Sequence, residues 1–205
     1  MSSPDAKIAS ETGGIPITEE GGNARGIPKT VFIDDVETFV EKYKAKETLE
    51  AMNELYRKYQ FMESQLAAGK RNLKIKLPEI KKTIDMVNLL KDKHEKDEKK
   101  FKTNFLISDN IWARAEADNS TGKVGLWLGA NVMIEHTYDE ALGLLAKNNE
   151  NATKKLESTN EDLDYIKDQI TTMEVNMARV YNQNVVNTNK EKKTKAEAAP
   201  EKVIH

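Results

Sequence analysis

The sequence predicts a mainly α-helical protein, built as a long antiparallel coiled-coil helical hairpin with two central β-hairpins. Three observations support this prediction. Charged residues make up 32% of the 205 residues and hydrophobic ones only 38%, with 10 Gly and 5 Pro, which is typical of long solvated helices. Two long stretches repeat apolar residues with a period of about 3.5, that of a coiled-coil seam. The segment between them alternates with period two, which indicates strands.

The first coiled-coil helix is expected over residues 48–101. Alternating steps of four and three residues from Met52 reach mostly apolar or aromatic side chains as far as Phe101. Pro78 lies inside this stretch and is expected to bend the helix, because proline lacks the backbone N–H and clashes with the preceding turn. The heptad pattern continues on both sides of Pro78, so we expect a single helix.

The second coiled-coil helix is expected over residues 138–186. From Tyr138 onward the same steps meet only two polar residues, Asn149 and Thr159. The two stretches most simply fold back on each other as antiparallel partners. If Phe101 faces Tyr138, the numbers of facing residues should sum to about 239.

Residues 102–137 are expected to form the two β-hairpins. Apolar residues alternate with others along this segment, and turn-forming residues gather at 118–122, as in paired antiparallel strands. A sheet this small cannot bury both faces of its strands. We therefore expect the hairpins to associate with those of other chains. The residues assigned to this assembly surface are Trp112, Val124, Leu126, Trp127, Leu128, Val132 and Ile134.

The two ends of the chain differ in composition from the helices. Residues 1–25 are rich in Gly, Ser, Thr and Glu and are expected to be a disordered leader, and residues 187–205 a disordered tail. In the region 26–47, the residues Asp34–Glu37 have the pattern of a helix N-cap with Glu at N3, opening a short helix to about Tyr43. This helix could brace a neighbouring chain or serve as a docking motif, and the sequence leaves both open.

Composition excludes several classes of function. The 32 basic and 34 acidic residues give a net charge of -2, without the basic excess that a nucleic-acid partner requires. The chain has no cysteine and only 3 histidines, so we expect no catalytic residue, no metal site and no cofactor. Glu161, Asp162 and Asp164 are interpreted as an acidic surface patch. No apolar run is long enough for a secretory signal or a transmembrane helix, so no membrane partner is expected.

Five segments of the chain resemble the prefoldin family. They are GIPKTVFIDDVETF (Gly26–Phe39), YQFMESQL (Tyr59–Leu66), LPEIKKT (Leu77–Thr83), VGLWLGANVMIEH (Val124–His136) and TTMEVNMARVYN (Thr171–Asn182). The order helix, two β-hairpins, helix is similar to that of the α-type prefoldin subunits, whereas β-type subunits have a single hairpin. The segments span most of the chain from Gly26 to Asn182.

The resemblance implies a partner set, a function and a location. It implies a hexamer of this chain with one other α-type and four β-type subunits, in which the hairpins form an intersubunit β-barrel and the coiled coils extend from it. The implied activity is capture of unfolded actin and tubulin without ATP and their delivery to the cytosolic chaperonin. The expected location is the cytoplasm, with the nucleus also open. The alternative is a structural coiled-coil adaptor or tethering protein, which would have no reason to carry the strand-rich insert.

Six apolar residues near the helix ends remote from the hairpins in sequence lie off the heptad register. Apolar side chains outside a seam lack an intrachain partner, so they are expected to be exposed or bound to something. Four of the 7 methionines occur towards the same ends, and flexible methionine suits surfaces that accept many apolar shapes. We predict that the six bind unfolded clients; otherwise they cap the coiled coil or contact a neighbouring subunit. They are Leu55, Phe61, Met62, Val175, Tyr181 and Val185.

Overall fold

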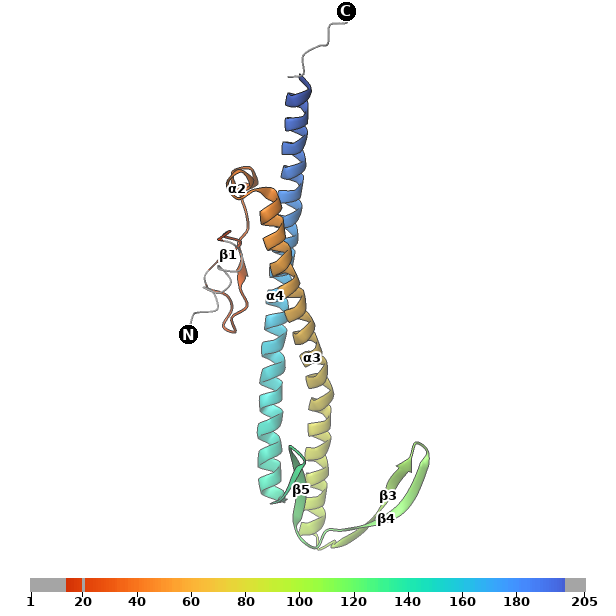
Figure 1. Cartoon of the computed structure of the whole chain (residues 1–205). Helices are drawn as coiled ribbons and strands as arrows, with labels where there is room; N and C mark the ends of the chain where they lie inside the picture. Colours follow the sequence, from red (N-terminus) through yellow and green to blue (C-terminus); the bar gives the residue numbers. More distant parts are fainter. Residues whose placement is uncertain (1–13, 20, 198–205) are drawn as a thin grey trace, which may run out of the picture. The chain divides into compact units, whose positions relative to one another are not determined.

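The computed structural model describes residues 14–19 and 21–197 (Figure 1). Contacts divide the chain into two compact units, unit 1 with Met1–Ala68 and Thr159–His205, and unit 2 with Gly69–Ser158. Two long helices pass through both units and give the mainly helical fold that the sequence predicts. The described elements are β1 (Thr18–Glu19), β2 (Lys29–Thr30), α2 (Val36–Tyr43), α3 (Ala45–Glu95), β3 (Lys100–Ser108), β4 (Ile111–Asp118), β5 (Lys123–Gly129), β6 (Val132–Thr137) and α4 (Tyr138–Glu197).

The first long helix, α3, ends at Glu95 and so is shorter than predicted. Asp97 adopts a left-handed φ of 56°, a conformation that commonly closes a helix. The N–H of Glu98 donates to the carbonyl of Lys93, five residues earlier, at 2.9 Å. This is the 6→1 hydrogen bond of a Schellman cap. As a consequence Phe101 lies in β3, and its assignment to the helix is wrong.

The two helices are antiparallel within each unit, as predicted, but their register differs from the prediction. In unit 1 the Tyr56 hydroxyl donates to Glu174 Oε1 at 2.8 Å. In unit 2 the Lys91 ammonium donates to Asp139 Oδ1 at 2.6 Å. The residue numbers in each of these pairs sum to 230. The predicted sum was too large because it took Phe101, a strand residue, as the end of the helix.

The second long helix, α4, continues to Glu197, beyond its predicted end. Residues 187–197 contain neither Gly nor Pro and include four Lys and two Glu, which favour helix. The ammonium of Lys190 lies 3.5 Å from the carboxylate of Glu37 in α2. The prediction of a disordered tail is therefore wrong for residues 187–197, while residues 198–205 lie outside the described part of the chain.

Both predicted β-hairpins are present, and all four of their strands belong to unit 2. β3 pairs with β4 and β5 with β6; each pair is antiparallel and forms its own two-stranded sheet. In the turn between β5 and β6, Ala130 and Asn131 have φ values of 48° and 59°. Positive φ at both central residues is the turn geometry that matches the right-handed twist of paired strands. The hairpin closes through local turn geometry.

Residues 14–19 and 21–43 form a segment, here called the strap, that packs against the helices of unit 1 (Figure 1). Within it β1 and β2 pair antiparallel, and Ile15 and Ile17 are buried. The prediction of a disordered leader is therefore wrong for residues 14–19 and 21–25. Residues 1–13 and residue 20 lie outside the described part of the chain.

The short helix α2 ends at Tyr43, as predicted. The Asp35 carboxylate caps it by accepting the backbone N–H of Thr38 at 3.2 Å. The hydroxyl and backbone N–H of Thr38 also lower the pKa of Asp35. The sequence pattern placed Glu37 at N3. Because Asp35 is the N-cap, Glu37 is instead the second helical residue, N2. Burial of Val36 holds the first turn of α2 in the unit 1 core.

Candidate functional site

The structure divides the seven predicted assembly residues into two groups. Val124 and Leu126 pack partly against a cluster of helical side chains in unit 2, so some of their surface is already covered within the chain. Leu128 lies in β5, and its side chain is outside the described part of the structure. The remaining four are exposed, namely Trp112, Trp127, Val132 and Ile134.

The β3–β4 hairpin exposes further apolar side chains that the sequence prediction did not include. Phe105, Leu106 and Ile107 on β3 and Ile111 on β4 are all exposed. Successive strand residues point to opposite faces, so three consecutive apolar residues make both faces of β3 apolar. That run is a sequence signal, because strands apolar on both faces are typically covered on both. An isolated two-stranded hairpin is marginally stable, and this one therefore needs a partner surface.

Asn119 connects both hairpins to the ends of the helices in unit 2. It lies between β4 and β5 and is only 2% exposed. Its side-chain amide donates to the carbonyl of Leu90 at 2.9 Å, and its backbone N–H donates to the carbonyl of Lys99 at 2.7 Å. The Tyr138 hydroxyl donates to its side-chain oxygen, and a ring nitrogen of His94 lies 2.9 Å from its carbonyl oxygen. These contacts fix the point from which the two hairpins leave the helices.

The six predicted client-binding residues fall into two environments. Phe61 is 65% exposed, and three residues of α4 are also exposed. Leu55 is only 2% exposed, and Met62 is half-buried against the same cluster as the strap. The expectation that these two lack an intrachain partner is therefore wrong, because the strap supplies one. The three exposed residues of α4 are Val175, Tyr181 and Val185.

The strap covers an apolar row along the seam between α3 and α4 in unit 1. From the strap this core contains Ile15, Ile17, Ile27, Ile33, Val36 and Val40. We call the helical side of the interface the strap groove, which is formed by Met52, Leu55, Tyr59, Ile166, Met173 and Val180. All of these side chains are buried. The strap and the two helices together bury this apolar row.

Tyr59 connects the strap groove to the backbone of the strap. Its hydroxyl donates to the carbonyl of Pro28 at 2.9 Å and lies 2.9 Å from the hydroxyl oxygen of Thr30. Burial raises the pKa of Tyr59 to about 12, so the hydroxyl is neutral near neutral pH. The apolar floor of the groove therefore carries a hydrogen-bond donor aimed at a main-chain carbonyl.

Three buried polar residues of α4 line the strap at intervals of seven residues, and we call them the polar ladder: Asp162, Gln169 and Asn176. Gln169 Oε1 accepts the backbone N–H of Thr30 at 2.8 Å. Asn176 Oδ1 accepts the N–H of Ile33 at 3.1 Å, and its side-chain amide donates to the carbonyl of Val31 at 2.6 Å. The ladder thus supplies the hydrogen bonds that the covered strap backbone needs.

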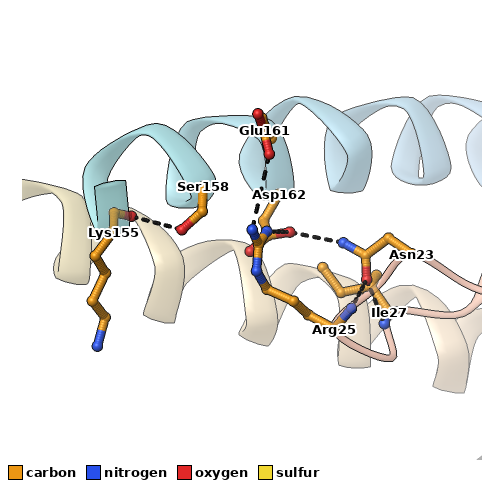
Figure 2. A network of polar contacts seen from close by, with 7 residues as sticks. All are labelled: Asn23, Arg25, Ile27, Lys155, Ser158, Glu161 and Asp162. Atoms are coloured by element: carbon orange, nitrogen blue, oxygen red, sulfur yellow. Dashed lines mark hydrogen bonds and ion pairs between the residues drawn. The ribbon is translucent and has the colours of Figure 1, made fainter. Parts of the chain in front are cut away.

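Asp162 holds the first turn of the strap through side chains (Figure 2). It is 4% exposed, accepts a hydrogen bond from the Asn23 side-chain amide at 2.8 Å, and pairs with the Arg25 guanidinium. The same guanidinium lies 3.9 Å from Glu161. The interpretation of these carboxylates as a surface patch is therefore wrong for Asp162, because the strap covers it and supplies a cation.

The fold defines a class of protein, a chain with two long antiparallel helices and two β-hairpins that expose apolar side chains. Comparison with known proteins gives the family. The family model described as "Prefoldin: Prefoldin subunit" matches residues 59–183. The chain belongs to the prefoldin family. Because the matched range begins at Tyr59, the strap lies outside it.

Three similar proteins are named Prefoldin subunit 3. The one from Mus musculus is 44% identical, over 93% of this chain and 100% of the relative. The one from Homo sapiens is 47% identical, over 86% of this chain and 92% of the relative. The one from the fungus Elsinoe fawcettii is 43% identical, over 88% and 91%. The similarity therefore covers nearly the whole length of these relatives.

None of the helices within residues 14–19 and 21–197 is long and apolar enough to cross a membrane. In the same part of the chain, no three His, Cys, Asp or Glu side chains are grouped so that they could hold a metal ion.

Proposed function

We propose that this chain is one of the two α-type subunits of a hexameric prefoldin co-chaperone that captures unfolded polypeptides without ATP. Its partners are one other α-type and four β-type subunits, joined to it through an intersubunit β-barrel. Its clients include unfolded actin and tubulin, which the assembly passes to the cytosolic chaperonin in the cytoplasm. The observation that carries this proposal is the apolar surface that both hairpins leave exposed, on a chain of the prefoldin family.

The hairpins support assembly because their exposed apolar surface has no cover within unit 2. Trp112 and Trp127 are exposed on different hairpins, so both hairpins need a partner. A strand pair with exposed edges gains hydrogen bonds and apolar contacts when it joins strands of another subunit. A coiled-coil adaptor would need only the helices, and nothing about the hairpins favours that alternative.

The exposed residues of unit 1 support capture of unfolded chains. Phe61, Tyr181 and Val185 offer apolar surface on helices that are otherwise well solvated. Burying apolar client surface contributes about 25 cal/mol per Å², so one small site binds weakly. Several subunits that hold the same client chain gain affinity through avidity. The proposed activity is not enzymatic and requires no cofactor, in agreement with a chain that has no cysteine and 3 histidines.

Assembly and capture can be tested in one experiment. The chain is co-expressed with the other five prefoldin subunits of its organism, and the purified complex is weighed by native mass spectrometry. Denatured actin is then diluted into buffer with and without the complex, and light scattering is followed in the absence and presence of ATP. We expect a hexamer that suppresses scattering equally in both conditions. A chain that enters no hexamer, or a hexamer that gives no protection, would contradict the proposal.

A further inference from the structure

The hydrogen bonds between α4 and the central strap go to main-chain atoms. Gln169 and Asn176 bond the backbone groups of Thr30, Val31 and Ile33. Arg179 donates to the carbonyls of Ile33 and of the following residue. Every peptide segment carries these groups, whatever its side chains. This part of α4 therefore recognises an extended backbone and not one particular sequence.

The spacing of the polar ladder matches the spacing of an extended chain. Gln169 and Asn176 are seven residues apart on a helix, which is about 10.5 Å at 1.5 Å per residue. Their backbone partners Thr30 and Ile33 are three residues apart, which is about 10 Å in an extended segment. One heptad of α4, which is about two helical turns, therefore advances as far as three residues of an extended chain. An extended peptide can follow α4 and meet a polar residue at each step.

The floor of the strap groove accepts apolar side chains from such a peptide. Thr30 and Ile33 are buried against it, whereas Phe32 between them is half-exposed. Met52 and Met173 line the groove, and methionine adapts its shape to different neighbours. The groove thus combines fixed backbone recognition with a deformable apolar floor, the combination expected of a site that binds extended apolar peptides.

We propose that the strap groove, with Gln169 and Asn176 of the polar ladder, is a peptide-binding site in which the strap exchanges with an extended apolar segment of an unfolded polypeptide. This inference rests on the proposed function, because it identifies a second client-binding surface beside the exposed residues. The strap ends in α2 and leads directly into α3, so it is tethered beside the groove and its effective concentration is on the order of millimolar. It covers the groove when no client is held, and a client held by several subunits displaces it.

The first experiment measures binding of the part of the strap that precedes α2, supplied as a separate peptide. The hexamer is prepared with the intact chain and with a chain that lacks residues 1–34, which keeps Asp35 and its cap on α2. A fluorescein-labelled peptide of residues 14–35 is titrated against each hexamer, and its anisotropy is measured. We expect the truncated hexamer to bind the peptide and the intact hexamer to bind it at least tenfold more weakly. No binding by a truncated hexamer that retains its helix content would overturn the proposal.

Substitutions in the truncated chain test the role of the polar ladder. Gln169→Leu and Asn176→Leu together leave peptide backbone groups without partners, and we expect them to weaken peptide binding more than tenfold. Asn182→Leu is the matched control, since Asn182 is an exposed residue of α4 outside the ladder. It should bind the peptide as the truncated parent does. Equal affinity in all three hexamers would show that the ladder does not recognise the peptide backbone.

The second experiment asks whether an unfolded polypeptide uses the same groove. The probe is reduced, carboxymethylated α-lactalbumin, which stays unfolded in buffer. We expect it to bind the truncated hexamer several-fold more tightly than the intact one and to be displaced by the strap peptide. Full-length Ile33→Ser, which loosens the strap without shortening the chain, should also bind the probe more tightly. Equal binding to all hexamers with no displacement would overturn the exchange and leave the proposed function standing. Failure of every hexamer to bind the probe would count against the proposed function. In that case the peptide titration still shows whether the strap groove binds peptides.

Discussion

Replacing Trp112 with serine should weaken assembly with partner subunits while leaving the chain itself folded. The side chain is 62% exposed, which is roughly 150 Å² of a tryptophan surface of up to about 250 Å². Covering that area contributes about 4 kcal/mol at about 25 cal/mol per Å². Part of this gain is offset by the ordering of both surfaces on binding. We therefore expect an association constant at least tenfold lower and at most about a thousandfold lower.

The assay separates assembly from folding. Circular dichroism of the hexamer subunits should show unchanged helix content, because Trp112 is exposed in the isolated chain. Native mass spectrometry of a dilution series should show subunit loss at higher concentrations than for the unaltered hexamer. Phe61→Ser is the matched control, since Phe61 is equally exposed but lies on α3 within unit 1. If Trp112→Ser and Phe61→Ser hexamers dissociate at the same concentration as the parent, the assignment of assembly to the hairpins is refuted.

Three further predictions concern the helices, the hairpin junction and pH. Changing Phe61, Tyr181 and Val185 together to Ser should keep the hexamer intact but reduce protection of denatured actin from aggregation; full protection in light scattering would place the client site elsewhere. Asn119→Leu leaves several buried partners unsatisfied and should destabilise unit 2 by about 2–4 kcal/mol in chemical unfolding; a change below about 0.5 kcal/mol would show that the junction is unimportant. Burial raises the pKa of Tyr59 to about 12 from 10.0, so the folded chain keeps a proton that the unfolded chain releases. Stability from this group is full below pH 10 and lost as pH rises towards 12, by about 2–3 kcal/mol; Tyr59→Phe should flatten that part of the unfolding profile.

The helices and hairpins could be predicted because each depends on a local pattern. The heptads of α3 and α4 and the period-two segment between them are visible in the sequence alone. The register could not be obtained in the same way. It depends on where α3 ends, and that end is set by Asp97 in a left-handed conformation. Gly is the usual residue at such a cap and Asp a less common one, so the sequence carried only a weak stop signal.

The short helix of the strap was predicted, but the packing of the strap on the helices was missed, because its burial depends on the groove and not on its own pattern. Ile15 and Ile17 are two residues apart, but the alternation does not continue beyond them, and the composition of residues 14–25 resembles that of a disordered segment. The polar ladder was not predicted either, although Asp162, Gln169 and Asn176 recur every seven residues in the sequence. Each of them precedes a seam position by one residue, where a polar side chain normally faces solvent. In the folded chain all three residues are buried and hydrogen-bond to the strap, which lies over them.

The two units deal with apolar surface in different ways, and the difference matches their proposed tasks. The hairpins of unit 2 leave Trp112 and Trp127 exposed, a surface that suits the permanent assembly proposed for them. The strap groove of unit 1 is covered by the chain itself. A groove left open would promote aggregation, whereas one sealed by sequence-specific packing alone would exclude a client. A tethered strap held through main-chain hydrogen bonds avoids both outcomes, because any extended peptide can replace those bonds one for one.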